Sequence, residues 1–133
     1  ELQEQYGDQL QIVYRDYPLS GGSGGLEPSI AANCAGAQGK YWEMHDELMR
    51  NTNYTDVALK AYGRAAKLDE EAFAACLAAP EAQLPEIMND FQDGRDLGVS
   101  GTPAFFINGI PVSGAVPKAQ FQLIIDAELA EKG

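Results

Sequence analysis

The chain has 133 residues, of which 45% are hydrophobic and 22% charged, which fits a single folded domain and excludes disorder along the whole chain. Its 20 acidic and 9 basic residues give a net charge of −11, so the surface repels phosphate backbones and anionic lipid, and we expect no nucleic-acid partner. No apolar run approaches the ~20 residues of a membrane-spanning helix, so we expect no membrane insertion.

The N-terminal residues predict the end of a helix followed by a strand. Leu2 and Tyr6 lie four positions apart, and Gly7 stands where a helix typically stops. The β-branched and apolar residues of Leu10–Tyr14 (LQIVY) predict a strand, which Pro18 prevents from continuing. We therefore expect the chain to begin inside an element of the fold.

The segment Ser20–Gly25 (SGGSGG) has the composition of a natural flexible loop and equally that of an engineered linker. The chain from Leu26 to Leu97 then predicts helices, with Thr55 and Asp69 as N-caps. The expected helices are Ser29–Gln38, Lys40–Arg50, Asp56–Leu68, Glu70–Ala78 and Pro85–Leu97.

The C-terminal part predicts a β-hairpin and a helix. The sequence TPAFFI at Thr102–Ile107 is typical of a strand, and Asn108-Gly109 is a strong signal for a tight hairpin turn. Ile110–Val112 is the expected partner strand, and Lys118–Lys132 is the expected amphipathic helix. The order of elements predicts an α/β or α+β domain with a large helical part.

The segment VSGTPAFFING contains the main candidate binding site. A proline at the start of a strand donates no hydrogen bond to its neighbour, and composition alone favours a trans bond between Thr102 and Pro103. A cis bond would instead turn the backbone groups around Thr102 outward. These groups could then pair with an extended peptide by strand addition.

The motifs GTPAFFING, IVYRDYPL, AANCAGAQGKYWEMHDELM and FAACLA together resemble the DsbA-like proteins of the thioredoxin fold, in the same order along nearly the whole chain. The resemblance implies an α/β thioredoxin-like fold, with residues 1–133 as one domain and a helical insertion at about 26–97. It also implies a thiol-disulfide oxidoreductase of the bacterial periplasm or cell envelope. Its partners would be cysteine-containing protein or peptide substrates and a redox-recycling protein.

The resemblance further implies that Pro103 is cis and that Val99, Ser100, Gly101, Thr102 and Pro103 contact the substrate. The family's catalytic dithiol is a CxxC at the start of its first core helix, and this sequence contains no CxxC. We therefore name no catalytic residue and leave open whether this chain is an enzyme. The fold is expected to be N-terminally incomplete, with the place of its central strand filled by an unrecorded N-terminal segment, another chain or a rearranged pairing of these strands.

Cys34 and Cys76 lie 42 positions apart on two predicted helices. The pair carries no CxxC loop, and Cys34 lies at no helix N-terminus that would lower its pKa, which disfavours a redox-active pair without removing that alternative. Two buried thiols acting as small hydrophobes are a further alternative. The resemblance implies a structural disulfide, since some DsbA-like proteins carry one in the helical insertion.

His45 is the sole histidine, and we interpret it as structural because no spacing in the sequence brings a set of metal ligands together. We expect no metal and no cofactor. The alternative to an oxidoreductase is a redox-inactive thioredoxin-like domain that binds peptides or acts as a scaffold. The sequence predicts no oligomeric state.

Overall fold

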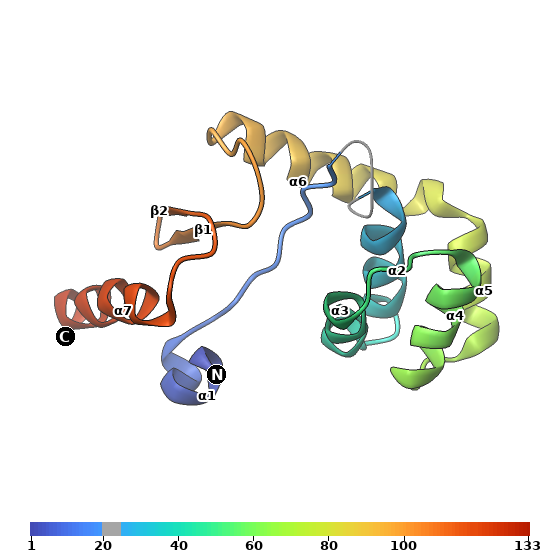
Figure 1. Ribbon diagram of the computed structural model, residues 1–133, viewed down its shortest axis with the longest axis horizontal. Coiled ribbons are helices and arrows are strands. Elements are labelled where there is room, and N and C mark those ends of the chain that lie inside the picture. Colours follow the sequence, from blue (N-terminus) through green and yellow to red (C-terminus); the bar gives the residue numbers. More distant parts are fainter. Residues whose placement is uncertain (20–24) are drawn as a thin grey trace. The chain divides into compact units, whose positions relative to one another are not determined.

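The computed structural model describes residues 1–19 and 25–133 (Figure 1). The predicted flexible segment Ser20–Gly25 therefore lies outside the described residues, except for Gly25. The chain divides into two compact units. Unit 1 consists of Glu1–Tyr14 and Gly94–Gly133, and unit 2 consists of Arg15–Asp93.

Unit 2 is built from packed helices. They are α2 (Leu26–Gly36), α3 (Tyr41–Arg50), α4 (Asp56–Ala65) and α5 (Glu70–Ala78), followed by a 3-10 turn at Pro80–Ala82 and by α6 (Leu84–Asp96), whose last residues belong to unit 1. Helix α2 packs against α3, α4 and α5 (Figure 1). These bounds confirm the predicted helices to within three residues at every end.

The core of unit 2 is formed where the apolar faces of these helices meet. Met44 on α3 and Phe73 on α5 are almost completely buried, together with the small residues of α2. The small side chains of α2 allow the other helices to approach closely. Gly63 on α4 has the same role, because a Cβ at this position would lie 2.8 Å from the ring of Phe73.

The predicted N-caps of α4 and α5 are confirmed. The Thr55 hydroxyl accepts a hydrogen bond from the Ala58 N–H at 3.4 Å, and the Asp69 carboxylate accepts one from the Ala72 N–H at 2.8 Å. Helix α4 ends three residues before the predicted Leu68. The reason is a left-handed turn at Lys67, with φ of 59°, which lets the Leu68 N–H reach the Gly63 carbonyl at 2.9 Å.

Unit 1 contains the hairpin and the two terminal helices. Its elements are α1 (Leu2–Tyr6), a 3-10 turn at Gly7–Gln9, β1 (Ala104–Ile107), β2 (Ile110–Ser113) and α7 (Lys118–Lys132). Strands β1 and β2 form an antiparallel pair with Ala104 opposite Ser113, joined by the predicted Asn108-Gly109 turn. Helix α1 is held to α7 by a hydrogen bond of 2.8 Å from the Tyr6 hydroxyl to Asp126.

The predicted strand at Leu10–Tyr14 is wrong. The segment is drawn without a strand in Figure 1, and β1 and β2 form the whole sheet of the described residues. Its composition favours a strand, but a strand needs a neighbour for its backbone groups, and none lies beside it in the described chain. Ile12 and Val13 are 49% and 67% exposed.

Among the helices of the described residues, none combines the length and the apolar character that crossing a membrane requires.

Candidate functional site

The loop that carries the candidate binding residues begins at the end of α6. Gly98 has φ of 82°, its N–H reaches the Arg95 carbonyl at 3.0 Å, and the Val99 N–H reaches the Gly94 carbonyl at 2.9 Å. These paired bonds are those of a helix end closed by a left-handed residue, a conformation that glycine adopts without steric cost. The helix end thereby fixes the direction in which Val99 leaves α6.

The Thr102–Pro103 peptide bond is cis. The Pro103 carbonyl accepts a hydrogen bond of 2.9 Å from the Gly114 N–H, which extends the β1–β2 pairing by one step. Within the described chain, the backbones of Ser100, Gly101 and Thr102 make no hydrogen bond to another backbone group. Their donors and acceptors are therefore available to a ligand.

A hollow of about 270 Å³ lies over this loop and the hairpin. Its lining comprises Leu97, Gly98, Val99, Ser100, Gly101, Thr102, Pro103, Ala104, Phe105, Phe106, Pro111, Val112, Ser113 and Gly114. None of these side chains is charged, and most are apolar. The ring of Phe105 packs edge-on against Phe121 of α7, with the ring centroids 4.8 Å apart.

Within the described residues, strand β1 pairs with β2 along one edge and with no strand along the other. Phe106 lies opposite Pro111, which has no N–H, so this pair lacks mutual backbone hydrogen bonds. Because such pairs alternate along an antiparallel ladder, the Ala104–Ser113 pair is of the same kind. The backbone N–H and C=O groups of Ala104 and Phe106 thus point away from β2, along an edge with no other strand in the described residues.

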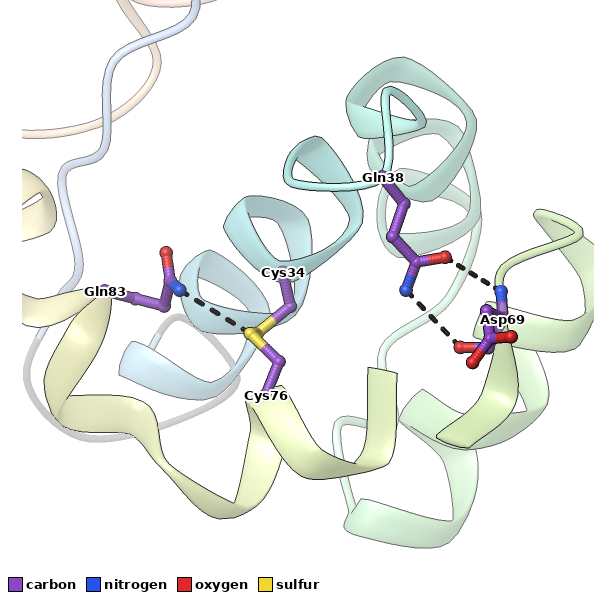
Figure 2. Close-up of a disulfide and its surroundings, with 5 residues drawn as sticks. All are labelled: Cys34, Gln38, Asp69, Cys76 and Gln83. Carbon is purple, nitrogen blue, oxygen red and sulfur yellow. Dashed lines mark hydrogen bonds between the residues drawn. A yellow bond between two sulfur atoms is a disulfide. The ribbon is translucent and has the colours of Figure 1, made fainter. Parts of the chain in front are cut away.

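Cys34 on α2 and Cys76 on α5 form a disulfide with a Cα–Cα distance of 5.8 Å (Figure 2). Cys34 is 1% exposed, and Gln83 Nε2 lies 3.5 Å from Cys76 Sγ. Since the sequence has two cysteines, this bond leaves no free thiol in the chain. The pair lies in unit 2, whereas the residues of the hollow all belong to unit 1.

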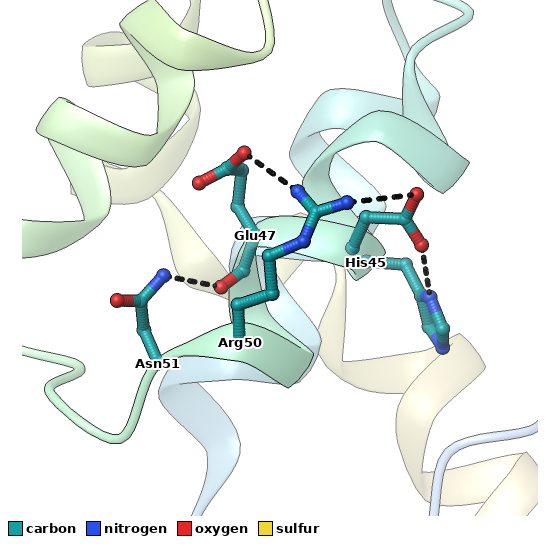
Figure 3. A network of polar contacts seen from close by, with 5 residues as sticks. His45, Glu47, Arg50 and Asn51 are labelled. Atoms are coloured by element: carbon teal, nitrogen blue, oxygen red, sulfur yellow. Dashed lines mark hydrogen bonds and ion pairs between the residues drawn. The ribbon is translucent and has the colours of Figure 1, made fainter.

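His45 belongs to a polar network along α3 (Figure 3). Its Nδ1 lies 3.4 Å from Asp46 Oδ1, and Arg50 pairs with both Asp46 and Glu47, at 3.8 and 3.2 Å. The Asn51 amide donates to the Glu47 carbonyl at 2.7 Å. In the part of the chain that the structure describes, no group of three or more His, Cys, Asp or Glu side chains is arranged to hold a metal ion.

Asp16 is a carboxyl group that is only 5% exposed, in unit 2. Its backbone N–H donates to Asp90 Oδ2 at 2.9 Å, and the preceding Arg15 pairs with Asp90 and, at 2.6 Å, with Asp93. The chain that enters unit 2 is thus tied to α6 by charge-assisted hydrogen bonds.

Burial raises the pKa of Asp16 above its ordinary value of 3.8. The hydroxyl of Ser29 opposes this by stabilising the ionised carboxylate, whereas the negative charges of Asp90 and Glu86 raise the pKa further. The sequence analysis did not single out this residue. Its burial depends on side chains from α2 and α6 that are distant in the sequence.

Comparison with known proteins identifies the family. The family model described as thioredoxin matches residues 1–127, which is nearly the whole chain. The chain belongs to the thioredoxin family. A solved structure of a thioredoxin-like oxidoreductase from Silicibacter pomeroyi DSS-3 superposes with a TM-score of 0.76 at 30% identity, over 91% of this chain and 68% of that one. The resemblance to DsbA-like proteins of thioredoxin fold is confirmed at the level of family and fold.

Curated relatives of this thioredoxin-family chain carry the matching region within much longer proteins. The Na(+)/H(+) antiporter NhaA 1 of Mycolicibacterium vanbaalenii is 29% identical over 83% of this chain, and that of Salinispora arenicola is 43% identical over 75%. The chain spans 18% and 16% of the length of these two relatives. Their names describe antiporters, and the match covers less than a fifth of each.

The sequence predicted one part of the lining of this hollow and missed another part. The structure brings the five predicted contact residues, from Val99 to Pro103, into the lining of one hollow. It adds Pro111–Gly114, the far strand of the hairpin and the residue after it. The Asn-Gly turn carried the signal for this, because it sets the register that places Gly114 beside Pro103. Substrate contact by these residues stays a prediction.

Proposed function

We propose that this chain is the substrate-binding part of a DsbA-like thiol-disulfide oxidoreductase that acts on cysteines of extended protein or peptide substrates. The observation that carries the proposal is the uncharged hollow beside Pro103, with the backbone groups of Ser100, Gly101 and Thr102 open to a ligand. Open backbone groups of this kind pair with an extended peptide by strand addition, which fixes the position and the direction of the peptide. Membership of the thioredoxin family supports exchange as the chemistry.

The exchange needs a dithiol that is not among these 133 residues. A substrate thiolate attacks one sulfur of the dithiol's oxidised form, a mixed disulfide forms, and the other sulfur leaves as a thiolate. A second substrate thiolate then resolves the mixed disulfide, so the substrate is oxidised by two electrons and the dithiol is reduced. A redox-recycling partner would restore the oxidised form. Cys34 and Cys76 do not fit this role, because Cys34 is buried.

We propose an extracytoplasmic compartment, the bacterial periplasm or cell envelope, as the location. The disulfide between Cys34 and Cys76 supports this, because structural disulfides persist where the surroundings are oxidising.

The second candidate is a redox-inactive domain that binds peptides or serves as a scaffold. The observation in its favour is that both cysteines of the chain are joined to each other. In this candidate the hollow binds peptides, and no thiol-disulfide exchange takes place.

An exchange assay on the natural protein separates the two candidates. We would follow reduction of insulin by a dithiol reductant, with the natural protein and with its Cys34→Ser/Cys76→Ser variant. The oxidoreductase proposal expects turnover above the reductant alone in both proteins, because the reacting dithiol lies outside this pair. An intact mass after alkylation of reduced protein would then show two further cysteines. No turnover and no further cysteine would leave the redox-inactive candidate.

A further inference from the structure

The turn of the β-hairpin contains a chemically labile pair of residues. Of the asparagines in the chain, Asn108 alone is followed by a glycine. An asparagine side chain can react with the backbone nitrogen of the next residue, and a glycine offers the least steric hindrance because it has no side chain. Asparagine is for this reason among the thermolabile residues of proteins. The turn therefore holds the asparagine with the greatest intrinsic tendency to react in this way.

The backbone nitrogen of Gly109 is available as the attacking group. The turn has two residues, and Ile107 and Ile110 face each other on either side of it. Within the described chain, the Gly109 N–H makes no hydrogen bond to another backbone group. A Cβ built on Gly109 would meet no atom within 4 Å, so the space beside it is open. Asn108 and Gly109 are both exposed, so water reaches the turn.

The side-chain amide of Asn108 is held by the C-terminal helix. Its Nδ2 donates a hydrogen bond to Oε2 of Glu128 at 2.8 Å. Glu128 lies on α7, and both residues belong to unit 1. The backbone of Asn108 adopts a left-handed conformation with φ of 48°, which asparagine tolerates better than most residues. The turn and α7 together therefore set where Cγ of Asn108 lies relative to the Gly109 nitrogen.

We propose that Asn108 is a site of spontaneous deamidation and that Glu128 slows the reaction. The Gly109 nitrogen gives its proton to hydroxide and attacks Cγ of Asn108. The bond from Cγ to the amide nitrogen breaks, and this nitrogen takes up a proton and leaves as ammonia, so a five-membered imide ring forms. One water then opens the ring at either carbonyl to give aspartate or isoaspartate. Overall, one water is consumed and one ammonia is released, with no oxidation or reduction.

Glu128 slows ring closure in two ways. The ring forms only when Cγ of Asn108 turns towards the Gly109 nitrogen, and the hydrogen bond to Glu128 opposes this rotation. Negative charge also develops on the attacking nitrogen and on the amide oxygen, and a neighbouring carboxylate disfavours it. Glu128 is thus a positioning residue, and its removal should accelerate the reaction.

The products would weaken the contact between the hairpin and α7. An aspartate at position 108 would place its carboxylate against that of Glu128, where the amide now donates a hydrogen bond. An isoaspartate would add one atom to the backbone of the two-residue turn that sets the register of β1 and β2. Since Pro111–Gly114 line the hollow, a change of register would also alter the candidate binding site.

Peptide mapping by mass spectrometry tests the proposal on the natural protein. The folded protein is incubated at mildly alkaline pH, and conversion at Asn108 is followed in the wild type, Glu128→Ala, Glu128→Gln and Glu131→Ala. We expect conversion in E128A to be about fivefold faster than in the wild type. E128Q keeps an acceptor oxygen without the charge and should lie between them. E131A removes the same charge from the same helix and should match the wild type.

The wild type unfolded in urea is the reference for an unrestrained turn. Conversion at Asn108 should be slower in the folded wild type than in urea, and E128A should approach the rate in urea. Equal rates in E128A and the wild type would overturn the proposal, as would equal acceleration by E131A. No conversion in folded E128A during a time in which the unfolded chain converts would also overturn it.

Asn108→Asp reproduces the aspartate product and tests its effect on α7. We expect N108D to lower the melting temperature by a few degrees at low salt, and to lower it less when E128Q is also present, because the repulsion is then removed. An equal loss in both backgrounds, or no loss, would contradict the proposed effect of the product. These measurements involve no thiol and no ligand, so their outcomes are independent of the exchange assay.

Discussion

At the scale of single residues, Asp16 makes the stability of the protein depend on pH in an unusual direction. Its raised folded-state pKa means that the native state binds a proton at pH values where the unfolded chain, with an ordinary pKa near 3.8, does not. Between these two pKa values the free energy of unfolding therefore falls as the pH rises. Most paired carboxylates contribute the opposite dependence.

We predict that Asp16→Asn stabilises the protein at neutral pH, because it removes a buried charge that faces Asp90 and Glu86. Urea unfolding of both proteins from pH 7 down to pH 4 measures this. The gap between them should be largest at neutral pH and should narrow as Asp16 of the wild type takes up its proton. A gap that does not change with pH would show that the Asp16 carboxyl does not titrate differently on unfolding.

At Gly63, the lack of a side chain larger than a hydrogen atom allows α4 to pack closely against α5. A Cβ at this position would lie 2.8 and 2.9 Å from Cδ1 and Cε1 of Phe73, which is buried and only 1% exposed. Alanine would stabilise α4 by about 1 kcal/mol through its higher helix propensity, whereas overpacking of a core costs about 1–3 kcal/mol. The steric cost is therefore the larger of the two contributions.

We therefore predict that Gly63→Ala lowers the free energy of unfolding by about 1 kcal/mol. The measurement is urea denaturation followed by circular dichroism. The matched control is the double variant Gly63→Ala/Phe73→Leu, which should show a favourable coupling because the smaller side chain leaves space for the new methyl group. Strict additivity of the two changes would mean that the clash is absorbed elsewhere.

At the scale of elements, the end of α4 offers a stabilising change. Lys67 adopts φ of 59° where glycine has no steric cost, and its side chain is exposed. We predict that Lys67→Gly raises the free energy of unfolding by about 0.5 kcal/mol. Glycine removes the cost of the left-handed conformation, and this gain exceeds the cost of the larger conformational entropy that glycine gives the unfolded chain. Thermal melting checks this against Lys67→Ala, which keeps the strain. Equal melting temperatures for the two variants would sink the argument.

The same scale shows which elements can be predicted from sequence. Helices α3 and α5 were predicted nearly residue by residue, because the Asp69 cap and the spacing of Tyr41, Met44 and Leu48 are local signals. The hairpin was also local, since Asn108-Gly109 sets both the turn and the register. The strand expected at Leu10–Tyr14 failed because strand formation depends on a partner elsewhere.

The two parts of the hollow's lining also differ in how far the sequence predicts them. The loop from Val99 to Pro103 was found through a motif in one stretch of sequence. The contribution of Pro111 and Gly114 follows from cross-strand pairing. The burial of Asp16 was missed because its partners on α2 and α6 come together only in the folded unit.

At the scale of the whole molecule, the disulfide is a cross-link within unit 2. It joins α2 to α5 across 42 positions, and Gln38 adds a second tie between the same parts, since its amide accepts from the Asp69 N–H at 2.8 Å and donates to the Asp69 carbonyl at 3.3 Å (Figure 2). A cross-link of this loop length lowers the entropy of the unfolded chain by an amount worth about 4 kcal/mol. That is a large share of the ~5–15 kcal/mol by which domains are stable.

We predict that reduction of this disulfide destabilises the helices of unit 2 by up to about 4 kcal/mol. Hydrogen exchange of the native protein, oxidised and reduced, measures the effect amide by amide, and protection should fall most in α2 and α5. The control is Cys34→Ala/Cys76→Ala, whose exchange in α2 and α5 should not change when reductant is added, because unit 2 then contains no cysteine. Unchanged protection in the reduced wild type would mean that helix packing and the Gln38 contacts hold α2 to α5 without the covalent bond.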